Sequence, residues 1–173
     1  MPYSIIEPAR FTDIDAISAL SRDLVEHGLG WSWTPARVSR TMRRNDTTVI
    51  VARLDGAVAG FAIMYFGADH ASLALLAVAQ GAQRQGLGRC LIGWMEASAR
   101  VAGLAAIRLE VRAINGVARR FYRGQGFREV AQVPGYYRGV ETAIRMIRDL
   151  RPAGVEARAE HAAQALLARV AAS

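Results

Sequence analysis

The most constraining stretch of this chain is an almost wholly apolar run followed by a glycine-rich loop. The run is "ASLALLAV", residues 71–78, and the loop is "QRQGLG", residues 83–88. A strand that is apolar at nearly every position is typical of the centre of a sheet, covered on both faces. The residues after Gly86 have a helical period with one apolar side. The loop therefore joins a buried strand to an amphipathic helix that packs on the sheet.

The N-terminal part alternates between strand and helix patterns. Residues 3–9 predict a strand, and residues 11–30 predict a helix with Thr12 as N-cap and Asp15 as its capping-box partner. Thr34 and Pro35 begin a second helix. Residues 47–66 contain two strand-like runs around Asp55-Gly56, which is a strong hairpin signal.

The C-terminal part predicts a strand over 106–113, a helix over 115–125, and two strands over 127–133 and 142–150 that are joined by "PGYYRGVE". A late hairpin after alternating elements indicates a mixed sheet of the α/β or α+β class, not a doubly wound one. From residue 151 the composition becomes alanine-rich. We expect one domain over residues 3–150 and a helical extension over residues 151–173.

The charge of the chain comes entirely from arginine. The formal net charge is +7, and all 22 basic residues are arginines. An excess of positive charge favours nucleic acid, a membrane surface or a phosphate-bearing ligand as a partner. Nucleic acid is disfavoured because the arginines are scattered and are not interleaved with stacking aromatics. The absence of lysine excludes a Walker-type or Schiff-base lysine.

A single cysteine, Cys90, excludes internal disulfides and zinc clusters, and we expect no metal. We expect Cys90 to be a buried small apolar residue. The N-terminus lacks the basic start and apolar run of a signal peptide, and no stretch approaches the ~20 apolar residues of a membrane span. These features predict a cytoplasmic protein without a membrane partner.

The glycine loop suits phosphate binding without lysine. Backbone N–H groups at a helix N-terminus bind phosphate, and Gly86 and Gly88 allow close approach. Arg84 and Arg89 add charged donors. A dinucleotide fingerprint is excluded because its third glycine is Leu91 here. A tight strand-to-helix turn with solvated arginines is the alternative interpretation.

Four segments in order, "LLAV", Q-R-x-G-L-G-R, "LEVRAIN" and N-x-x-A-R-x-F-Y-x-x-x-G-F, resemble the GNAT superfamily of acetyl-CoA-dependent N-acetyltransferases. The resemblance covers most of residues 3–150 and is densest over 76–127. It implies a mixed, mostly antiparallel sheet flanked by helices, with acetyl-CoA as co-substrate. The loop would then hold the pyrophosphate of coenzyme A.

The resemblance also implies the site residues. The pantetheine arm would meet the strand backbone at Leu76, Ala77 and Val78, and the pyrophosphate would meet Arg84, Gln85, Gly86, Leu87, Gly88 and Arg89. Asn115 would contact the cofactor arm, although its position also suits a helix N-cap. Tyr122 would stand near the sulfur, although a core aromatic beside Phe121 is the alternative.

Within the superfamily, "LEVRAIN", "FYRGQGF", "GYYRGVETAIRM" and "GWS" are most similar to the ribosomal-protein-alanine N-acetyltransferases. This implies a primary amine as acceptor, in particular a protein N-terminal α-amine. The expected acceptor residues are the aromatics of two loops, Trp31, Trp33, Tyr136 and Tyr137. Such loops also serve as ordinary lids. The short "RGVET" connection and the C-terminal extension depart from the family pattern and leave the acceptor open.

Acetyl transfer to an amine needs a base and a proton donor. Glu110 is the candidate base, directly or through water, and Tyr122 the candidate acid, with the Val78 N–H polarising the carbonyl. Arg108 and Arg112 flank Glu110 on its strand face, so a surface ion pair is the alternative. A small-amine acceptor (polyamine, amino acid or antibiotic) and a non-catalytic acyl-CoA sensor also stay open, as do monomer and homodimer.

Overall fold

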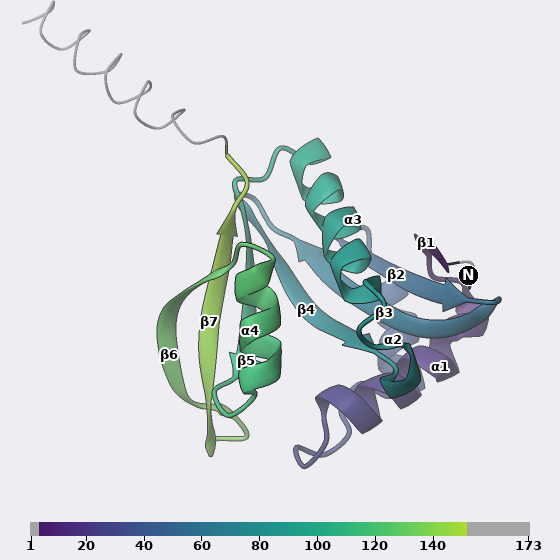
Figure 1. Cartoon of the computed structure of the whole chain (residues 1–173), viewed down its shortest axis with the longest axis horizontal. Coiled ribbons are helices and arrows are strands. Elements are labelled where there is room, and N and C mark those ends of the chain that lie inside the picture. Colours follow the sequence, from purple (N-terminus) through teal and green to yellow (C-terminus); the bar gives the residue numbers. More distant parts are fainter. Residues whose placement is uncertain (1–3, 152–173) are drawn as a thin grey trace, which may run out of the picture.

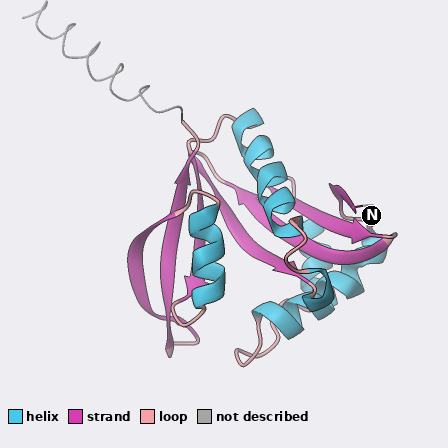
Figure 2. Ribbon diagram, viewed as in Figure 1, coloured by secondary structure: helices cyan, strands magenta, loops and turns pink. Residues whose placement is uncertain are grey.

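The computed structural model describes residues 4–151, which form a seven-stranded sheet in the order β1-β2-β3-β4-β5-β7-β6 (Figures 1 and 2). The strands are β1 Ser4–Pro8, β2 Thr47–Leu54, β3 Ala57–Phe66, β4 His70–Val78, β5 Ala106–Arg112, β6 Arg128–Tyr137 and β7 Glu141–Asp149. Only β4 and β5 are parallel neighbours, and every other pair is antiparallel. The predicted mixed sheet and the hairpin at Asp55-Gly56 are confirmed.

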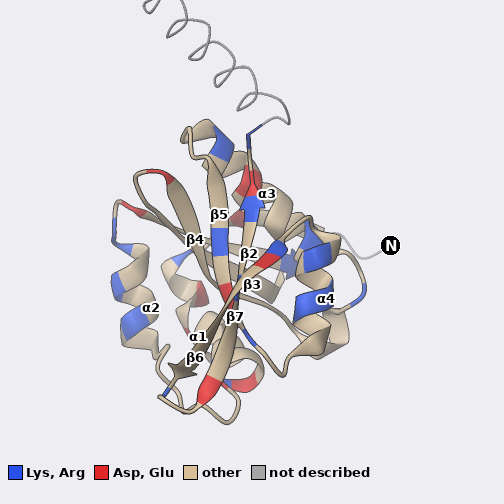
Figure 3. Cartoon of the chain, turned by 90° about the vertical axis from the view of Figure 1, so that its left-hand side faces the viewer, with Lys and Arg blue, Asp and Glu red and all other residues tan. Residues whose placement is uncertain are grey.

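Helices cover both faces of this sheet. They are α1 Ile14–Leu20, α2 Pro35–Met42, α3 Leu87–Val101 and α4 Gly116–Gly124, with the shorter turns η1 Phe11–Asp13, η2 Ser21–Val25 and η3 Gln80–Ala82. α1 and α2 lie on one face, and α3 and α4 lie on the other (Figure 3). Phe61 and Ile63 of β3 pack toward α1 and α2, whereas Ala62 and Met64 join the core with α3. This alternation follows from the period of two along a strand.

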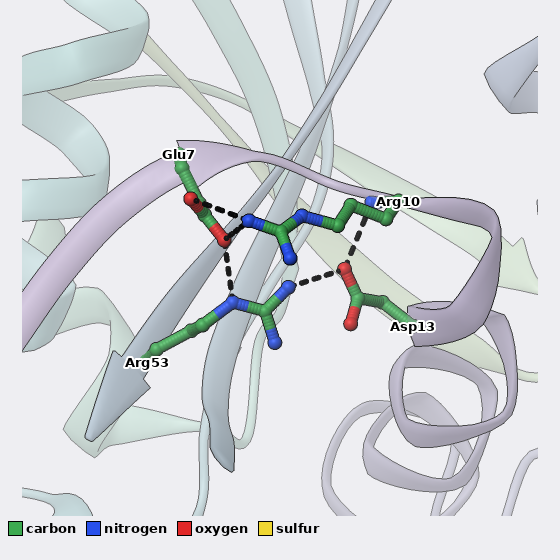
Figure 4. A network of polar contacts seen from close by, with 4 residues as sticks. All are labelled: Glu7, Arg10, Asp13 and Arg53. Carbon is green, nitrogen blue, oxygen red and sulfur yellow. Dashed lines mark hydrogen bonds and ion pairs between the residues drawn. The ribbon is translucent and has the colours of Figure 1, made fainter. Parts of the chain in front are cut away.

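The start of the first helix differs from the prediction. Thr12 is not the N-cap, because the chain enters through η1, where the Asp13 carboxylate accepts the Arg10 N–H at 2.8 Å. The same Asp13 oxygen lies 2.8 Å from the Arg53 guanidinium, which also bonds Glu7 (Figure 4). Arg53 comes from β2, far along the chain. No local sequence pattern therefore shows that the carboxylate at the start of the first helix is that of Asp13 and not that of the predicted Asp15.

The predicted loop between the last two strands is mostly strand. β6 continues through Tyr137, and the turn occupies residues 138–140. The register shifts between Val133 and Tyr137, where Gly135 has a φ of +68°. A bulge of this kind bends a strand and redirects its side chains. Tyr136 and Tyr137 therefore sit on a bulged strand end.

Cys90 is exposed, contrary to the prediction that it is buried. The inward stripe of α3 is formed by Leu87, Leu91 and Met95, and Cys90 falls on the other side of the helix. The predicted extension lies outside the described residues apart from Arg151. Within residues 4–151, no helix is both long and apolar enough to span a membrane.

Candidate active site

The sheet opens between β4 and β5. These strands are paired only at His70–Ser72 with Ala106–Arg108, and beyond that point they diverge (Figures 1 and 2). A register shift opposite Ile63 and Met64 leaves Ala74 of β4 without a partner, so a bulge marks the divergence. The Ala79 N–H bonds Ala59 of β3 at 2.8 Å. Alternation then directs the N–H groups of Leu76 and Val78 toward the open side.

Two cavities lie along this opening. The smaller cavity has a volume of about 510 Å³ and the larger about 660 Å³. They share the lining residues Leu24, Val25, Leu76, Asn115, Ala118 and Tyr122. Because the shared residues include both β4 and α4, the two cavities form one channel between the diverging strands.

Nine of the ten predicted cofactor residues line the smaller cavity, namely Leu76, Ala77, Val78, Arg84, Gly86, Leu87, Gly88, Arg89 and Asn115. Gln85 does not line it, and its side chain donates to the Gly81 carbonyl at 3.2 Å. Gln83, which was not predicted, does line it and donates to the Val78 carbonyl at 3.0 Å. Gln83 thereby ties the loop to the end of β4.

The two loop glycines meet different requirements. Gly86 has a φ of +84°, the left-handed conformation that glycine adopts without strain, and it turns the chain into α3. A side chain at Gly88 would lie 3.1 Å from the Phe121 ring of α4, so this glycine allows α3 and α4 to pack together. The amides of Leu87, Gly88 and Arg89 precede the first hydrogen bond of α3, which runs from Cys90 to the Gly86 carbonyl at 3.0 Å, and all three residues line the smaller cavity.

Asn115 precedes α4 as its N-cap, as predicted. Its side-chain oxygen accepts the Ala118 N–H at 3.0 Å. Asn115 also lines both cavities. The capping bond fixes the side chain at the place where β5 ends and α4 begins, beside the channel.

Tyr122 stands where the two cavities meet. It lies on α4, is 8% exposed, and contacts the rings of Phe121 and Phe127 edge-to-face at 5.2 and 5.6 Å. Burial raises the pKa of Tyr122 above its ordinary value of 10.0, and Tyr137 adds to this effect. The phenol is therefore neutral at physiological pH and can donate a proton. The core-aromatic and proton-donor interpretations are geometrically compatible.

Glu110 lines the larger cavity from β5. Its carboxylate lies 2.8 Å from the Arg145 guanidinium, its register partner on β7. The predicted flanking cation Arg112 instead pairs with Glu141 and donates to the His27 carbonyl at 2.7 Å. Sequence reasoning missed Arg145, because the β5–β7 pairing that sets it opposite Glu110 joins strands that are distant in the chain and leaves no trace in local spacing.

The predicted acceptor aromatics separate into two groups. Trp33, Tyr136 and Tyr137 line the larger cavity, and the Tyr137 hydroxyl donates to the Glu110 carbonyl at 3.4 Å. Trp31 does not line it. Trp31 is 44% exposed, and its indole N–H donates to the Trp33 carbonyl at 3.1 Å. Trp31 therefore lies on the outer side of the loop that forms this wall of the larger cavity.

Glu26 is a second residue that sequence reasoning missed. It lines the larger cavity, is buried, and accepts hydrogen bonds from the Ser32 and Trp33 amides at 2.7 and 3.1 Å and from the hydroxyls of Ser21 and Ser32. Burial alone raises the pKa of Glu26, but these donors outweigh it and hold the pKa below its ordinary 4.5. Glu26 thus fixes the loop over residues 26–33. A lone acid after a π-helical turn gives no recognisable sequence signal.

The opening between β4 and β5 is bordered on one side by the left-handed glycine turn and the start of α3, and on the other side by the loop that Glu26 fixes. This arrangement defines the class of protein to which the chain belongs. The profile of the Acetyltransferase (GNAT) family matches residues 15–127, and the chain belongs to this family. The resemblance noted in the sequence is confirmed. Within residues 4–151, no group of three His, Cys, Asp or Glu side chains could hold a metal ion.

Curated relatives match part of this chain. The [ribosomal protein bS18]-alanine N-acetyltransferase of Escherichia coli K12 is 40% identical over 95 residues, which cover 53% of this chain and 64% of that protein. An uncharacterized N-acetyltransferase of Methanocaldococcus jannaschii is 35% identical over 99 residues, 57% of this chain and 64% of that protein. The matched regions thus span slightly under two thirds of these relatives.

Solved structures agree over a longer span. The crystal structure of the ribosomal-protein-S18-alanine N-acetyltransferase from Escherichia coli has a TM-score of 0.76 at 29% identity and covers 88% of this chain and 97% of that one. Ard1 from Thermoplasma volcanium has a TM-score of 0.78 at 26% identity, with 86% and 99% covered. The described fold is therefore the fold of this family.

Proposed function

We propose that this protein is an acetyl-CoA-dependent N-acetyltransferase whose acceptor is a primary amine, specifically a protein N-terminal α-amine. The observation that carries the proposal is the single channel along the β4–β5 opening. Its smaller cavity is lined by the glycine loop that suits a phosphate, and its larger cavity is lined by the Glu110 carboxylate. Tyr122 lies where the two cavities meet. Donor and acceptor could therefore meet at one side chain.

The smaller cavity fits a pyrophosphate carrying a pantetheine arm. The free amides at the start of α3 suit a phosphate. Arg84 and Arg89 line the cavity and, within the described chain, have no carboxylate partner. The N–H groups of Leu76 and Val78 point toward the opening and make no hydrogen bond to β5. They can therefore donate hydrogen bonds to an extended arm that carries amide groups. Bound there, acetyl-CoA would supply the acetyl group as a thioester.

The chain's own groups then divide the proton transfers. Glu110 accepts the proton of the attacking amine, directly or through water, as the nitrogen–carbon bond forms. The Val78 N–H stabilises the charge that develops on the carbonyl oxygen. As the carbon–sulfur bond breaks, the neutral Tyr122 phenol donates its proton to the departing thiolate. Arg145 orients the Glu110 carboxylate through their 2.8 Å contact.

The acceptor assignment is supported by the larger cavity and by the relatives. The cavity is walled by Trp33, Tyr136 and Tyr137, whose rings exclude water, and the two tyrosine hydroxyls can hold a peptide backbone. The relatives named as alanine N-acetyltransferases of a ribosomal protein act on a protein substrate. We expect a small first residue such as alanine or serine, because a bulky one would hold the amine away from the thioester.

The test is intact-mass spectrometry of peptides that differ only in their first residue, incubated with acetyl-CoA beside polyamines, amino acids and aminoglycosides. We expect one acetyl group on the α-amine of peptides with small first residues. Peptides with a blocked α-amine are the matched control and should stay unmodified. Transfer to small amines alone would change the acceptor class, and no transfer despite bound acetyl-CoA would indicate a sensor and overturn the proposal.

A further inference from the structure

The charged residues that line the larger cavity are not equally neutralised. They are Glu26, Arg37, Glu110, Arg112 and Arg138. Glu110 is paired with Arg145, and Arg112 with Glu141. Both oxygens of Glu26 already accept two hydrogen bonds each, which occupies the acceptor capacity of a carboxylate. The four donors to Glu26 are neutral, so its carboxylate keeps a negative charge that no cation among residues 4–151 pairs.

Arg37 and Arg138 differ from Arg112. Within residues 4–151, neither has a carboxylate within ion-pair distance. Arg37 of α2 is half-buried, donates once to the Ser32 hydroxyl at 3.1 Å, and lies 4.0 Å above the Trp33 ring. A guanidinium carries five N–H donors, so most of those on Arg37 remain available.

Arg138 contacts the same loop from a different element. It lies in the turn between β6 and β7, and its guanidinium rests against Gly30, where an added side chain would lie 2.2 Å from the Arg138 Nη2 atom. Gly30 therefore leaves the space that Arg138 occupies. Because Arg37 contacts Ser32 and Trp33, both guanidinium groups border the loop over residues 30–33 at the wall of one cavity.

With two unpaired cations, Arg37 and Arg138, against one unpaired anion, Glu26, the larger cavity carries an excess of positive charge, which is an unfavourable setting for an amine alone. An α-amine is mostly protonated near neutral pH and would be repelled. A carboxylate on the same acceptor removes that repulsion and makes charge-assisted hydrogen bonds with guanidinium groups. Resting on the proposed function, we infer that the acceptor carries a carboxylate close to its reactive amine and that Arg37 and Arg138 bind it.

The carboxylate can come from an acidic side chain near the N-terminus of a protein or from the α-carboxylate of a very short acceptor. The experiment separates these sources. One arm uses peptides that begin with alanine and carry Glu, Gln or Lys at position two, three or four. The other arm uses alanyl dipeptides with a free or an amidated C-terminus. Both kcat/KM for transfer and Kd by calorimetry are measured for each acceptor.

We expect Glu to be preferred over Gln by about 10-fold at one or more positions, with Lys the poorest, and the preference to shrink at high salt. Arg37→Met and Arg138→Met should each reduce the preference, and the double variant should abolish it. Arg40→Met is the matched control, because Arg40 also lies on α2 but is exposed and does not line the cavity. Unchanged acetyl-CoA affinity shows that the variants are folded.

Equal kcat/KM and equal Kd for the Glu and Gln peptides, together with no effect of C-terminal amidation, would overturn the inference while leaving the proposed function intact. A preference that survives in the double variant would overturn it as well. If no acceptor is acetylated, the proposed function fails, and the Kd comparison still decides whether the two arginines bind a carboxylate. Absence of binding by every acceptor overturns the inference.

Discussion

At the scale of single residues, Tyr122 combines burial with access to the channel. Within residues 4–151, no buried side-chain polar atom lacks a hydrogen-bond partner, and no protein group bonds the Tyr122 hydroxyl. The hydroxyl oxygen must therefore reach the cavity, while the ring stays between Phe121 and Phe127. The ring belongs to the core, and the hydroxyl is available for chemistry.

Tyr122→Phe removes only that hydroxyl. We expect unchanged stability and acetyl-CoA affinity, because both ring contacts remain, and a kcat lower by about 100-fold, which is typical of a lost general acid. Steady-state kinetics at saturating acetyl-CoA, with calorimetry of cofactor binding, check this. Since burial raises the pKa of Tyr122 above 10.0, the phenol keeps its proton as pH rises, and wild-type activity should not fall through Tyr122 ionisation below pH 10.0. An unchanged kcat would refute the assigned role.

At the scale of elements, one arginine links the N-terminal strand and the turn before α1 to β2, in addition to the β1–β2 ladder. Arg53 of β2 bonds Glu7 of β1 at 2.5 Å and Asp13 of η1 at 2.8 Å (Figure 4). Its side chain is 13% exposed and that of Asp13 is 6% exposed. Arg10, in contrast, is 67% exposed. The interior pair thus carries more of the attachment than the surface pair.

We expect Arg53→Met to lower the free energy of unfolding by about 2 kcal/mol, because it leaves the buried Asp13 without its cation. The matched variant Arg10→Met should change it by less than about 1 kcal/mol. Urea denaturation measures both. The hydrogen bond from Arg53 lowers the pKa of Glu7 below 4.5, so that contribution is present above pH 4.5 and is lost as pH falls. The Arg53→Met deficit should narrow in acid, and equal effects of the two variants would count against this account.

At the scale of the whole molecule, the sequence predicts the elements well but not the pairs that they form. The hydrophobic period and the turn residues were enough to predict the hairpin at Asp55-Gly56, the strand before the glycine loop and the helix cap at Asn115. Arg145 beside Glu110 depends on strand register, and the four donors on Glu26 depend on a loop closing over it. Because such partners are distant in the chain, neither composition nor hydrophobic period predicts them.

The opening between β4 and β5 makes a prediction for hydrogen exchange. Bound acetyl-CoA should slow exchange at the amides of Leu76 and Val78, which face the opening. The amide of Ala77 is the internal control, because alternation directs it to β3 and it should exchange slowly with or without ligand. Exchange measured by NMR with and without acetyl-CoA checks this. Equal protection of Leu76 and Val78 in both states would show that the ligand does not bond this strand.

The short β4–β5 ladder also bears on how the molecule unfolds. One half-sheet, β1 to β4, and the other, β5 to β7, share only the rungs between His70–Ser72 and Ala106–Arg108. Along the rest of β4 and β5 the two halves are held together by side chains, in one core shared with α3 and through pairs such as Arg148 with Glu96. A ligand bound between these strands would add backbone hydrogen bonds where the ladder stops. Occupancy should therefore stabilise the whole molecule against unfolding, with a higher melting temperature as the visible sign.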